Sequence, residues 1–268
     1  MNNKEIKGSL SSPLVSVVIP VKNGENFLKE AIDSVLLQTL DNFELLICIN
    51  PSTDKTLEVA SEYRSDPRVR VIPFKEPVGI SANFDRASRL ATGKYIKFLC
   101  HDDILLPNCL ELMVQQIEKL GVSMVCSYEK FLNSANAPRT GSAFGNRTVV
   151  STKRSLQRFV RYGNWVGSPT GVLMKNIDHL CFQESLNCAW DQELWTRISL
   201  TSAIGVVPEI LYLTRIHSEQ QTSYCHQGGF EIERRWILSE MSRVRGDYPL
   251  WINLVATFFK LKEFGLYR

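Results

Sequence analysis

The sequence lacks the features that mark several large classes of protein. None of its apolar runs is long enough to span a bilayer. Residues 1–13 are polar and have no hydrophobic centre of the kind found in signal peptides, so we expect a flexible leader. The formal net charge is only +3, which predicts no nucleic-acid partner. Together these absences favour a globular, cytoplasmic protein.

Cysteine-based metal motifs and glycine-rich phosphate loops are also missing. No CxxC pair occurs, which argues against zinc knuckles and thioredoxin-type chemistry. Neither GxGxxG nor GxxxxGK[ST] is present, so a nucleotide site in this chain would not be cradled by glycines. Several cysteines lie in apolar runs, as expected for reduced thiols in a reducing compartment. The seven cysteines are Cys48, Cys100, Cys109, Cys126, Cys181, Cys188 and Cys225.

What is present is a regular alternation of strands and helices in the first hundred residues. Apolar runs predict strands at 15–20, 44–49, 69–72 and 95–99, with helices at 27–40, 56–63 and 80–90 between them. Near-continuous apolar strands separated by helices indicate a parallel sheet covered on both faces. Ligands bind such sheets at the carboxyl ends of the strands. Here those ends carry the polar segments 20–25, 50–54 and 100–103.

The remainder of the chain is less regular, and we expect an α/β domain with a C-terminal helical extension. Helices are predicted at 110–120, 155–161 and from 190, and strands at 123–128, 172–174, 203–207 and 211–216. We therefore divide the chain into a leader (1–13), a domain (14–225) and a helical segment (226–268). Within the domain, 14–107 would form the nucleotide-binding half and 108–225 the acceptor-binding half.

Two adjacent carboxylates, Asp102 and Asp103, end the fourth predicted strand. Side-by-side anions repel and are costly to desolvate unless a cation compensates for them. Oxygen ligands favour Mg²⁺ or Mn²⁺ over zinc, and Mg²⁺ is commonly held by one or two carboxylates together with substrate phosphates. The alternative is a solvated acidic turn, which is frequent at loop tips.

Several segments, in order, resemble the family 2 glycosyltransferases. LVSVVIPVKNGENFLKEAIDSVLLQT is similar to the opening VSVIIPxYNxxxxLxxxIxSILxQT of that family, and FELLICINPSTDKT to its second strand and VDDGSTD turn. ATGKYIKFLCHDDILLP resembles AxGxYIxFLDxDDxxxP, AWDQELWTRI resembles a late ED-x-DLWxRL segment, and TRIHSEQQTS resembles YRxHxxxxS. The resemblance covers about residues 14–225. It implies a GT-A fold and an inverting transfer of a sugar from a nucleotide donor to an acceptor hydroxyl, assisted by Mn²⁺ or Mg²⁺.

The resemblance also assigns roles to individual residues. Asp191 would be the general base, and Asp103 would bind the metal with His217 as a second candidate ligand. Asp102 would face the ribose or the sugar phosphate. The residues expected to bind the donor are Pro20, Asn23, Glu25, Asn50, Arg86, Asp102 and Arg215. Arg86, Arg215 and His217 are candidates from their places near predicted strand ends, and the alternatives are a solvated helix face for Arg86 and a surface pair for Arg215 and His217. For Asp191, the competing interpretation is a favourable charge at a helix N-terminus.

Three positions depart from the family pattern. Ile49 and Asn50 replace the usual pair of aspartates, and Cys100 replaces the first aspartate of the third motif. These changes leave the identity of the donor open. They also keep open a catalytically inactive sugar- or nucleotide-binding relative, and a nucleotidyltransferase is a further alternative.

The expected partners follow from the same resemblance and from the C-terminal segment. They are a nucleotide sugar, which we expect to be a UDP-sugar, and a growing cell-surface polysaccharide or lipid-linked glycan. The C-terminal segment interleaves aromatic and aliphatic residues with arginine and lysine, a pattern that suits packing on the sheet, a homodimer seam or an anionic membrane surface. We therefore expect the protein in the cytoplasm, with peripheral contact to the membrane as one alternative.

Overall fold

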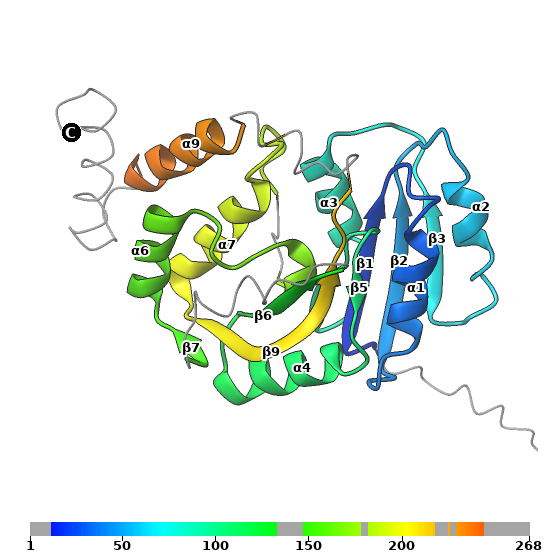
Figure 1. Cartoon of the computed structure of the whole chain (residues 1–268), viewed down its shortest axis with the longest axis horizontal. Coiled ribbons are helices and arrows are strands. Elements are labelled where there is room, and N and C mark those ends of the chain that lie inside the picture. Colours follow the sequence, from blue (N-terminus) through cyan, green and yellow to red (C-terminus); the bar gives the residue numbers. More distant parts are fainter. Residues whose placement is uncertain (1–11, 133–146, 178–181, 218–224, 226–228, 244–268) are drawn as a thin grey trace, which may run out of the picture.

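The computed structural model describes residues 12–132, 147–177, 182–217, 225 and 229–243 (Figure 1). Its first half has the predicted alternation of strands and helices. The elements are β1 (Val15–Val21), α1 (Leu28–Leu36), β2 (Phe43–Ile49), α2 (Thr56–Ser61), β3 (Val69–Pro73), α3 (Ile80–Ser88) and β4 (Tyr95–Phe98). All seven residues of β1 and of β2 are buried, which is why these strands read as continuous apolar runs.

The second half supplies shorter strands and longer-range pairings. Its elements are β5 (Ile104–Leu105), α4 (Cys109–Leu120), β6 (Met124–Phe131), β7 (Val149–Val150), α6 (Thr152–Tyr162), the 3₁₀ turn η1 (Pro169–Gly171), β8 (Val172–Lys175), α7 (Trp190–Thr201), β9 (Ile204–Thr214) and α9 (Gly229–Arg243). Within the described residues the strands form one sheet in the order β3-β2-β1-β4-β8-β6-β9-β5, with β7 paired to β9. The α/β class predicted from the sequence is confirmed.

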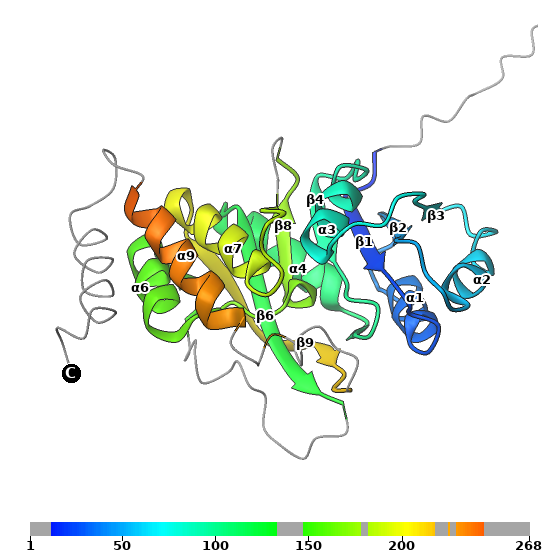
Figure 2. The ribbon, with the colours of Figure 1, turned by 90° about the horizontal axis from the view of Figure 1, so that it is seen from above.

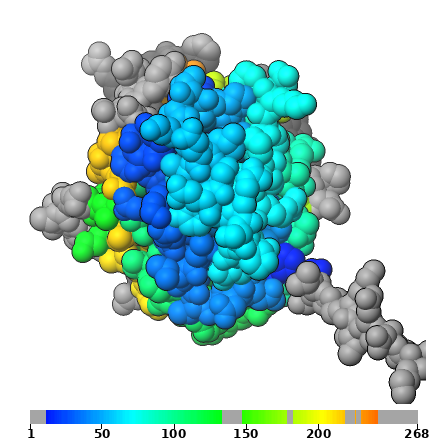
Figure 3. All heavy atoms as spheres, turned by 90° about the vertical axis from the view of Figure 1, so that its right-hand side faces the viewer, coloured from blue at the N-terminus to red at the C-terminus, as the bar shows by residue number. Residues whose placement is uncertain are grey.

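Helices cover both faces of this sheet (Figures 1 and 2). One buried cluster joins the sheet to α1, α2 and α4, and a second joins it to α3, α6, α7 and α9. Strands β1 to β4 are parallel, whereas β8 runs antiparallel to both β4 and β6. Seen from the end that carries β3, the N-terminal half presents a continuous face of its own (Figure 3). The boundary at 107/108 stays a prediction.

One strand differs from the expectation. The sequence predicted two strands at 203–207 and 211–216, but the structure has a single strand, β9, from Ile204 to Thr214. Pro208 lies inside it, where the register against β6 shifts on either side of Tyr128. Proline has no N–H to donate to the neighbouring strand, but it is tolerated at such irregularities. The two segments predicted from the sequence are therefore one continuous strand in the structure.

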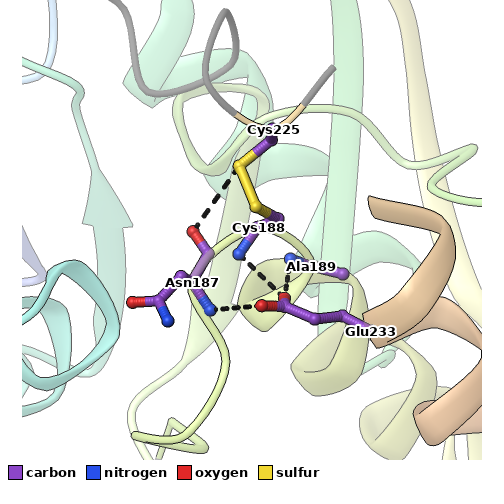
Figure 4. Close-up of a disulfide and its surroundings, with 5 residues drawn as sticks. All are labelled: Asn187, Cys188, Ala189, Cys225 and Glu233. Atoms are coloured by element: carbon purple, nitrogen blue, oxygen red, sulfur yellow. Dashed lines mark hydrogen bonds between the residues drawn. A yellow bond between two sulfur atoms is a disulfide. The ribbon is translucent and has the colours of Figure 1, made fainter. Parts of the chain in front are cut away.

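The cysteines also correct an expectation. Cys188 and Cys225 form a disulfide with their Cα atoms 5.5 Å apart (Figure 4). The sequence pattern indicated reduced thiols for several cysteines and gave no sign of this pair, because the two residues are 37 positions apart. Four other cysteines are free, namely Cys48, Cys100, Cys109 and Cys126, while Cys181 lies outside the described residues.

The described part of the C-terminal segment is α9. Its Ile237 and Leu238 are buried, so packing on the domain is confirmed for this helix. Ile232 and Trp236 point outward and are 70% and 39% exposed. The rest of the segment, 244–268, lies outside the described residues. Among the described helices, none has the length and apolar character needed to cross a bilayer.

Candidate functional site

The loops after β1 and β2 are joined by hydrogen bonds at the carboxyl edge of the sheet. The Asn23 side-chain oxygen accepts a bond from the Thr53 N–H at 3.0 Å, and the Glu25 carboxylate accepts one from the Lys55 N–H at 2.9 Å. The Gly24 N–H donates to the Thr56 hydroxyl at 2.7 Å. Asn23 has φ 53°, a left-handed conformation that asparagine tolerates better than most residues. The structure therefore brings Asn23 and Glu25 to the predicted edge and uses their oxygens to fix the neighbouring loop.

The predicted donor residues Pro20, Asn50 and Arg86 lie deeper. Pro20 is buried within β1 opposite Cys48. The side-chain oxygen of Asn50 accepts bonds from the Val78 N–H and from Arg86, and its amide group donates to the Val78 carbonyl. The Arg86 guanidinium lies 3.8 Å from the centre of the Phe74 ring. These contacts hold the segment after β3 in place. The side chain of Asn50 is therefore bonded to protein, and a direct contact between Asn50 and a nucleotide base stays a prediction.

Asp103 is buried and bonded on both oxygens. Its carboxylate accepts the Thr170 hydroxyl at 2.6 Å and the Arg215 N–H at 3.3 Å, and it is 3% exposed. Burial, with the charge of Asp102 as a second cause, holds the pKa of Asp103 well above its usual range. Thr170 was not singled out from the sequence, because it comes from η1, 67 residues further along the chain.

Asp102 is more open and faces an imidazole. Its Oδ2 lies 3.0 Å from Nε2 of His217, and the two side chains are 13% and 18% exposed. The His217 ring packs 4.8 Å from the Phe27 ring at the start of α1. The structure thus joins residues 115 positions apart into a carboxylate–imidazole pair at the carboxyl edge of β4.

Arg215 holds this arrangement together. Its guanidinium donates to the Asp102 carbonyl at 3.2 Å and to the Glu30 carboxylate at 2.9 Å, and lies 4.6 Å from the Phe27 ring centre. Its N–H donates to Asp103, so this single residue touches both members of the acidic pair.

The ligand atoms of Cys100, Asp102 and Asp103 lie within 4.8 Å of one another, close enough for one cation. Burial raises the pKa of the Cys100 thiol well above its usual value, so this cysteine is a neutral and weak ligand. The remaining donors, two carboxylates and the nearby imidazole of His217, suit Mg²⁺ or Mn²⁺. The neighbouring His101 packs against the first loop, since a Cβ at Gly24 would lie 2.9 Å from its ring.

Asp191 lies in the first turn of α7. Its Oδ1 accepts the Gln192 N–H at 2.6 Å and its Oδ2 accepts the Asn164 amide at 2.8 Å. Burial raises its pKa to about 7. The segment 164–170 connects it to the acidic pair, because Asn164 donates to Asp191 and the Thr170 hydroxyl donates to Asp103. A carboxylate with such a pKa can exchange a proton near neutral pH.

The aromatic residues beside Asp191 are buried. Trp190 and Trp195, which flank Asp191 in the sequence, are 5% and 0% exposed in the second core cluster. Both rings are therefore packed on protein, because this stretch of α7 faces the sheet. Trp165 is likewise buried, and its indole N–H donates to the Ser155 carbonyl at 3.1 Å.

Comparisons with known protein sequences place the chain among glycosyltransferases. The family model for Glycosyl transferase family 2 matches residues 16–175. An uncharacterized glycosyltransferase of Rickettsia typhi is 29% identical over 95% of this chain and 82% of its own length. Chondroitin synthase of Escherichia coli is 37% identical over 211 residues, which are 77% of this chain and 29% of that protein.

Solved structures with the same fold include two proteins in complex with nucleotide sugars. S. aureus TarS 1–349 in complex with UDP-GlcNAc has a TM-score of 0.76 at 21% identity, over 95% of this chain and 73% of that one. The mannosyltransferase PcManGT of Pyrobaculum calidifontis, in complex with GDP-Man and Mn²⁺, has a TM-score of 0.66 at 15% identity, over 92% of this chain and 69% of that one. The fold expected from the sequence, GT-A, is confirmed by this likeness.

Proposed function

The chain belongs to glycosyl transferase family 2, and we propose that it moves a sugar from a nucleotide-diphosphate donor to an acceptor hydroxyl with inversion of the anomeric carbon. One observation carries the proposal. The Asp102–His217 pair and the Asp191 carboxylate are connected by one short segment, because Asn164 donates to Asp191 and Thr170, six residues later, donates to Asp103 beside Asp102. A UDP-sugar is the donor we expect, since TarS, the solved structure with the higher TM-score of the two, holds UDP-GlcNAc.

The acidic cluster fits a divalent cation, and we assign its members different tasks. From the sequence the ligands were expected to be Asp103 and His217. The bonding favours Asp102 and His217 as the residues that face the cation, because both are partly exposed and Asp103 is occupied by Thr170 and Arg215. Asp103 would then fix the backbone that carries Asp102. A bound Mn²⁺ or Mg²⁺ would offset the negative charge that develops on the leaving diphosphate.

Asp191 would take the proton from the acceptor hydroxyl. It must be ionised to act as a base, so transfer should rise as the pH passes through about 7, the pKa that burial gives this carboxyl. The amide of Asn164 and the N–H of Gln192 donate to its two oxygens, and this fixes the orientation of the carboxylate.

The donor would lie along the rim formed by the first two loops. Asn23 and Glu25 border it from the first loop, Asn50 and Arg86 support its floor, and Arg215 adds positive charge beside the acidic pair. Arginine suits a diphosphate because its planar group offers several N–H donors at once. The departures at positions 49, 50 and 100 leave the base and sugar of the donor to experiment.

The acceptor is proposed to be a growing cell-surface polysaccharide or a lipid-linked glycan. Support for peripheral membrane contact comes from α9, whose outer face exposes Ile232 and Trp236 next to Arg235. Apolar and basic side chains on one helix face suit the surface of an anionic bilayer. Homodimer formation stays a prediction.

A thermal-shift panel tests the proposal at its first step. UDP-GlcNAc, UDP, GDP-Man and GDP are each added with and without Mn²⁺, and a metal-dependent rise in melting temperature with at least one nucleotide sugar is expected. Isothermal titration then gives the affinity of the best ligand. No stabilisation and no heat with any of these compounds would contradict the proposal and favour a protein that binds other ligands.

A further inference from the structure

The turn that leads into α7 is held from outside the domain core by one carboxylate on α9. Glu233 accepts three consecutive backbone N–H groups: those of Asn187 at 2.8 Å, Cys188 at 2.8 Å and Ala189 at 2.7 Å (Figure 4). Asp191 follows two residues after the last of them. Hydrogen bonds to an ionised acceptor are stronger than neutral ones, and a negative charge is favourable at a helix N-terminus. Glu233 therefore fixes the backbone immediately before the proposed base.

The same turn carries a second connection to the C-terminal segment. Cys188, whose N–H donates to Glu233, is bonded through its sulfur to Cys225. The first residue of α9, Gly229, packs directly against this cysteine, since a Cβ there would lie 2.7 Å from the Cys188 sulfur. Only a residue without a side chain fits at that distance, so the start of α9 is held close to the turn.

α9 also reaches the other side of the proposed base. Arg234 donates to the Val160 carbonyl near the end of α6. A Cβ at Gly163 would lie 3.8 Å both from Nε of Arg234 and from Oε1 of Gln192. Asn164 follows Gly163 in the chain. The Asn164 amide and the Gln192 N–H are the two groups that donate to the oxygens of Asp191. Arg234 of α9 and Gln192 thus both lie beside Gly163, the residue before Asn164, while the residues before the proposed base are bonded to Glu233 of α9.

We propose that Glu233 is a positioning residue for Asp191, and that α9 sets the direction of the catalytic carboxylate through the turn 187–189. The inference rests on the proposed function, in which Asp191 is the base. It gives α9 a part in the chemistry that packing alone does not require, because Ile237 and Leu238 already anchor this helix to the core.

The charge of Glu233 has an electrical consequence as well. Burial is the main cause of the raised pKa of Asp191, and the Glu233 carboxylate raises it further. Cys100, which follows β4, is a further titratable group close enough to interact electrostatically with Asp191. Removing the charge of Glu233 should therefore lower the pKa of Asp191, so that the acid limb of the pH–rate profile moves to lower pH.

Three variants distinguish the effect of the length of the Glu233 side chain, the effect of its charge and the effect of losing any charge on α9. Glu233→Gln keeps the size of the side chain and removes its charge. Glu233→Asp keeps the charge and shortens the reach. Glu231→Gln is the matched control, because it removes a charge from the same helix at an exposed residue whose ion pairs are with Arg234 and Arg235.

The experiment measures transfer from UDP-GlcNAc with Mn²⁺, following release of UDP, together with hydrogen exchange of the amides of 187–189. If another nucleotide sugar gives the larger thermal shift, it replaces UDP-GlcNAc. We expect Glu233→Gln to lower kcat about tenfold, because small displacements of a reacting group cost at least that much, with KM for the donor changed less than about twofold. Its acid limb should move to lower pH and its three amides should exchange faster.

The control variants decide between positioning and simple stability. Glu233→Asp should lower kcat without moving the acid limb, and Glu231→Gln should behave like the wild type in every measurement. Glu233→Gln with wild-type kcat, acid limb and amide exchange would overturn the inference. Equal losses in Glu233→Gln and Glu231→Gln would also overturn it, since they would reflect loss of charge on α9 in general.

An Asp191→Asn variant, assayed in parallel, keeps the two proposals apart. If that variant transfers sugar normally, the assignment of the base fails. Faster exchange of the 187–189 amides in Glu233→Gln would in that case still establish that Glu233 holds the turn. Hydrogen exchange also decides if a variant is too unstable to assay, because exchange confined to 187–189 differs from exchange spread over the core.

Discussion

The two halves of the sheet hold their functional residues in different ways. In the N-terminal half, neighbouring loops bond to each other: Asn23 to Thr53 and Glu25 to Lys55, each pair 30 residues apart. In the C-terminal half the proposed base is held by Asn164, from the segment after α6, and the turn before it is held by Glu233 from α9. The donor edge is thus built within one run of parallel strands. The proposed base, by contrast, is held by segments of the C-terminal half, and this arrangement would separate donor binding from chemistry.

The largest expected effect is on kcat and concerns the C-terminal half alone. Asp191→Asn keeps the shape of the side chain and removes the base, so kcat should fall about 10²–10⁴-fold while donor affinity stays within about twofold. Steady-state transfer assays and donor titrations measure the two quantities. Normal transfer by this variant would remove Asp191 from the mechanism.

The next largest expected effect is on stability and comes from the disulfide, which lies in the C-terminal half. It closes a segment of 37 residues between Cys188 and Cys225, and the chain-entropy estimate for such a loop is about 3–4 kcal/mol of stability. Dithiothreitol should therefore lower the denaturation midpoint of the wild type but not that of Cys188→Ser. Equal sensitivity of the two proteins to the reductant would show that this bond does not form in solution.

A smaller effect is expected where the two halves meet. The Thr170 hydroxyl donates to Asp103 and accepts the Cys100 N–H, so Thr170→Val leaves buried polar groups unpaired at a cost of about 1–3 kcal/mol. Urea denaturation measures this loss. Thr201→Val, at an exposed residue in the last turn of α7, is the control and should change stability little.

The smallest effect concerns stability rather than rate. The raised pKa of Asp191 means that the folded protein binds this proton more tightly than the unfolded chain does. The associated stability is present at low pH and is lost as the pH rises through about 7. At pH 8 Asp191→Asn should therefore be more stable than the wild type, by about 1 kcal/mol because the carboxyl is partly exposed, and the difference should vanish below about pH 4. A stability difference that does not depend on pH would contradict this.

The same comparison explains what could be predicted from the sequence. Buried parallel strands leave continuous apolar runs, so the strands and loops of the first half and the acidic pair at their edge were identified correctly. Local patterns carry no information about partners far along the chain. Three connections join residues 37 to 67 positions apart. They are the Thr170–Asp103 hydrogen bond, the Cys188–Cys225 disulfide and the hydrogen bonds that Glu233 accepts from 187–189.

The site residues illustrate the same limit. Asp102, Asp103, Arg215 and His217 come together as the resemblance implied, but their division of work does not follow from spacing. Adjacent aspartates look equivalent in sequence, and only burial separates Asp103, bonded on both oxygens, from the more open Asp102. Trp190 and Trp195 likewise flank Asp191 in sequence, yet helical geometry turns both rings into the core.

The central claim is that donor and metal binding belong to one group of residues and proton removal to another. Calorimetric titration of UDP in the presence of Mn²⁺ tests it most directly, with the wild type, Asp102→Asn and Asp191→Asn side by side. Asp102→Asn should lose the Mn²⁺-dependent binding, whereas Asp191→Asn should bind like the wild type. Unchanged binding by Asp102→Asn, or lost binding by Asp191→Asn, would contradict the account.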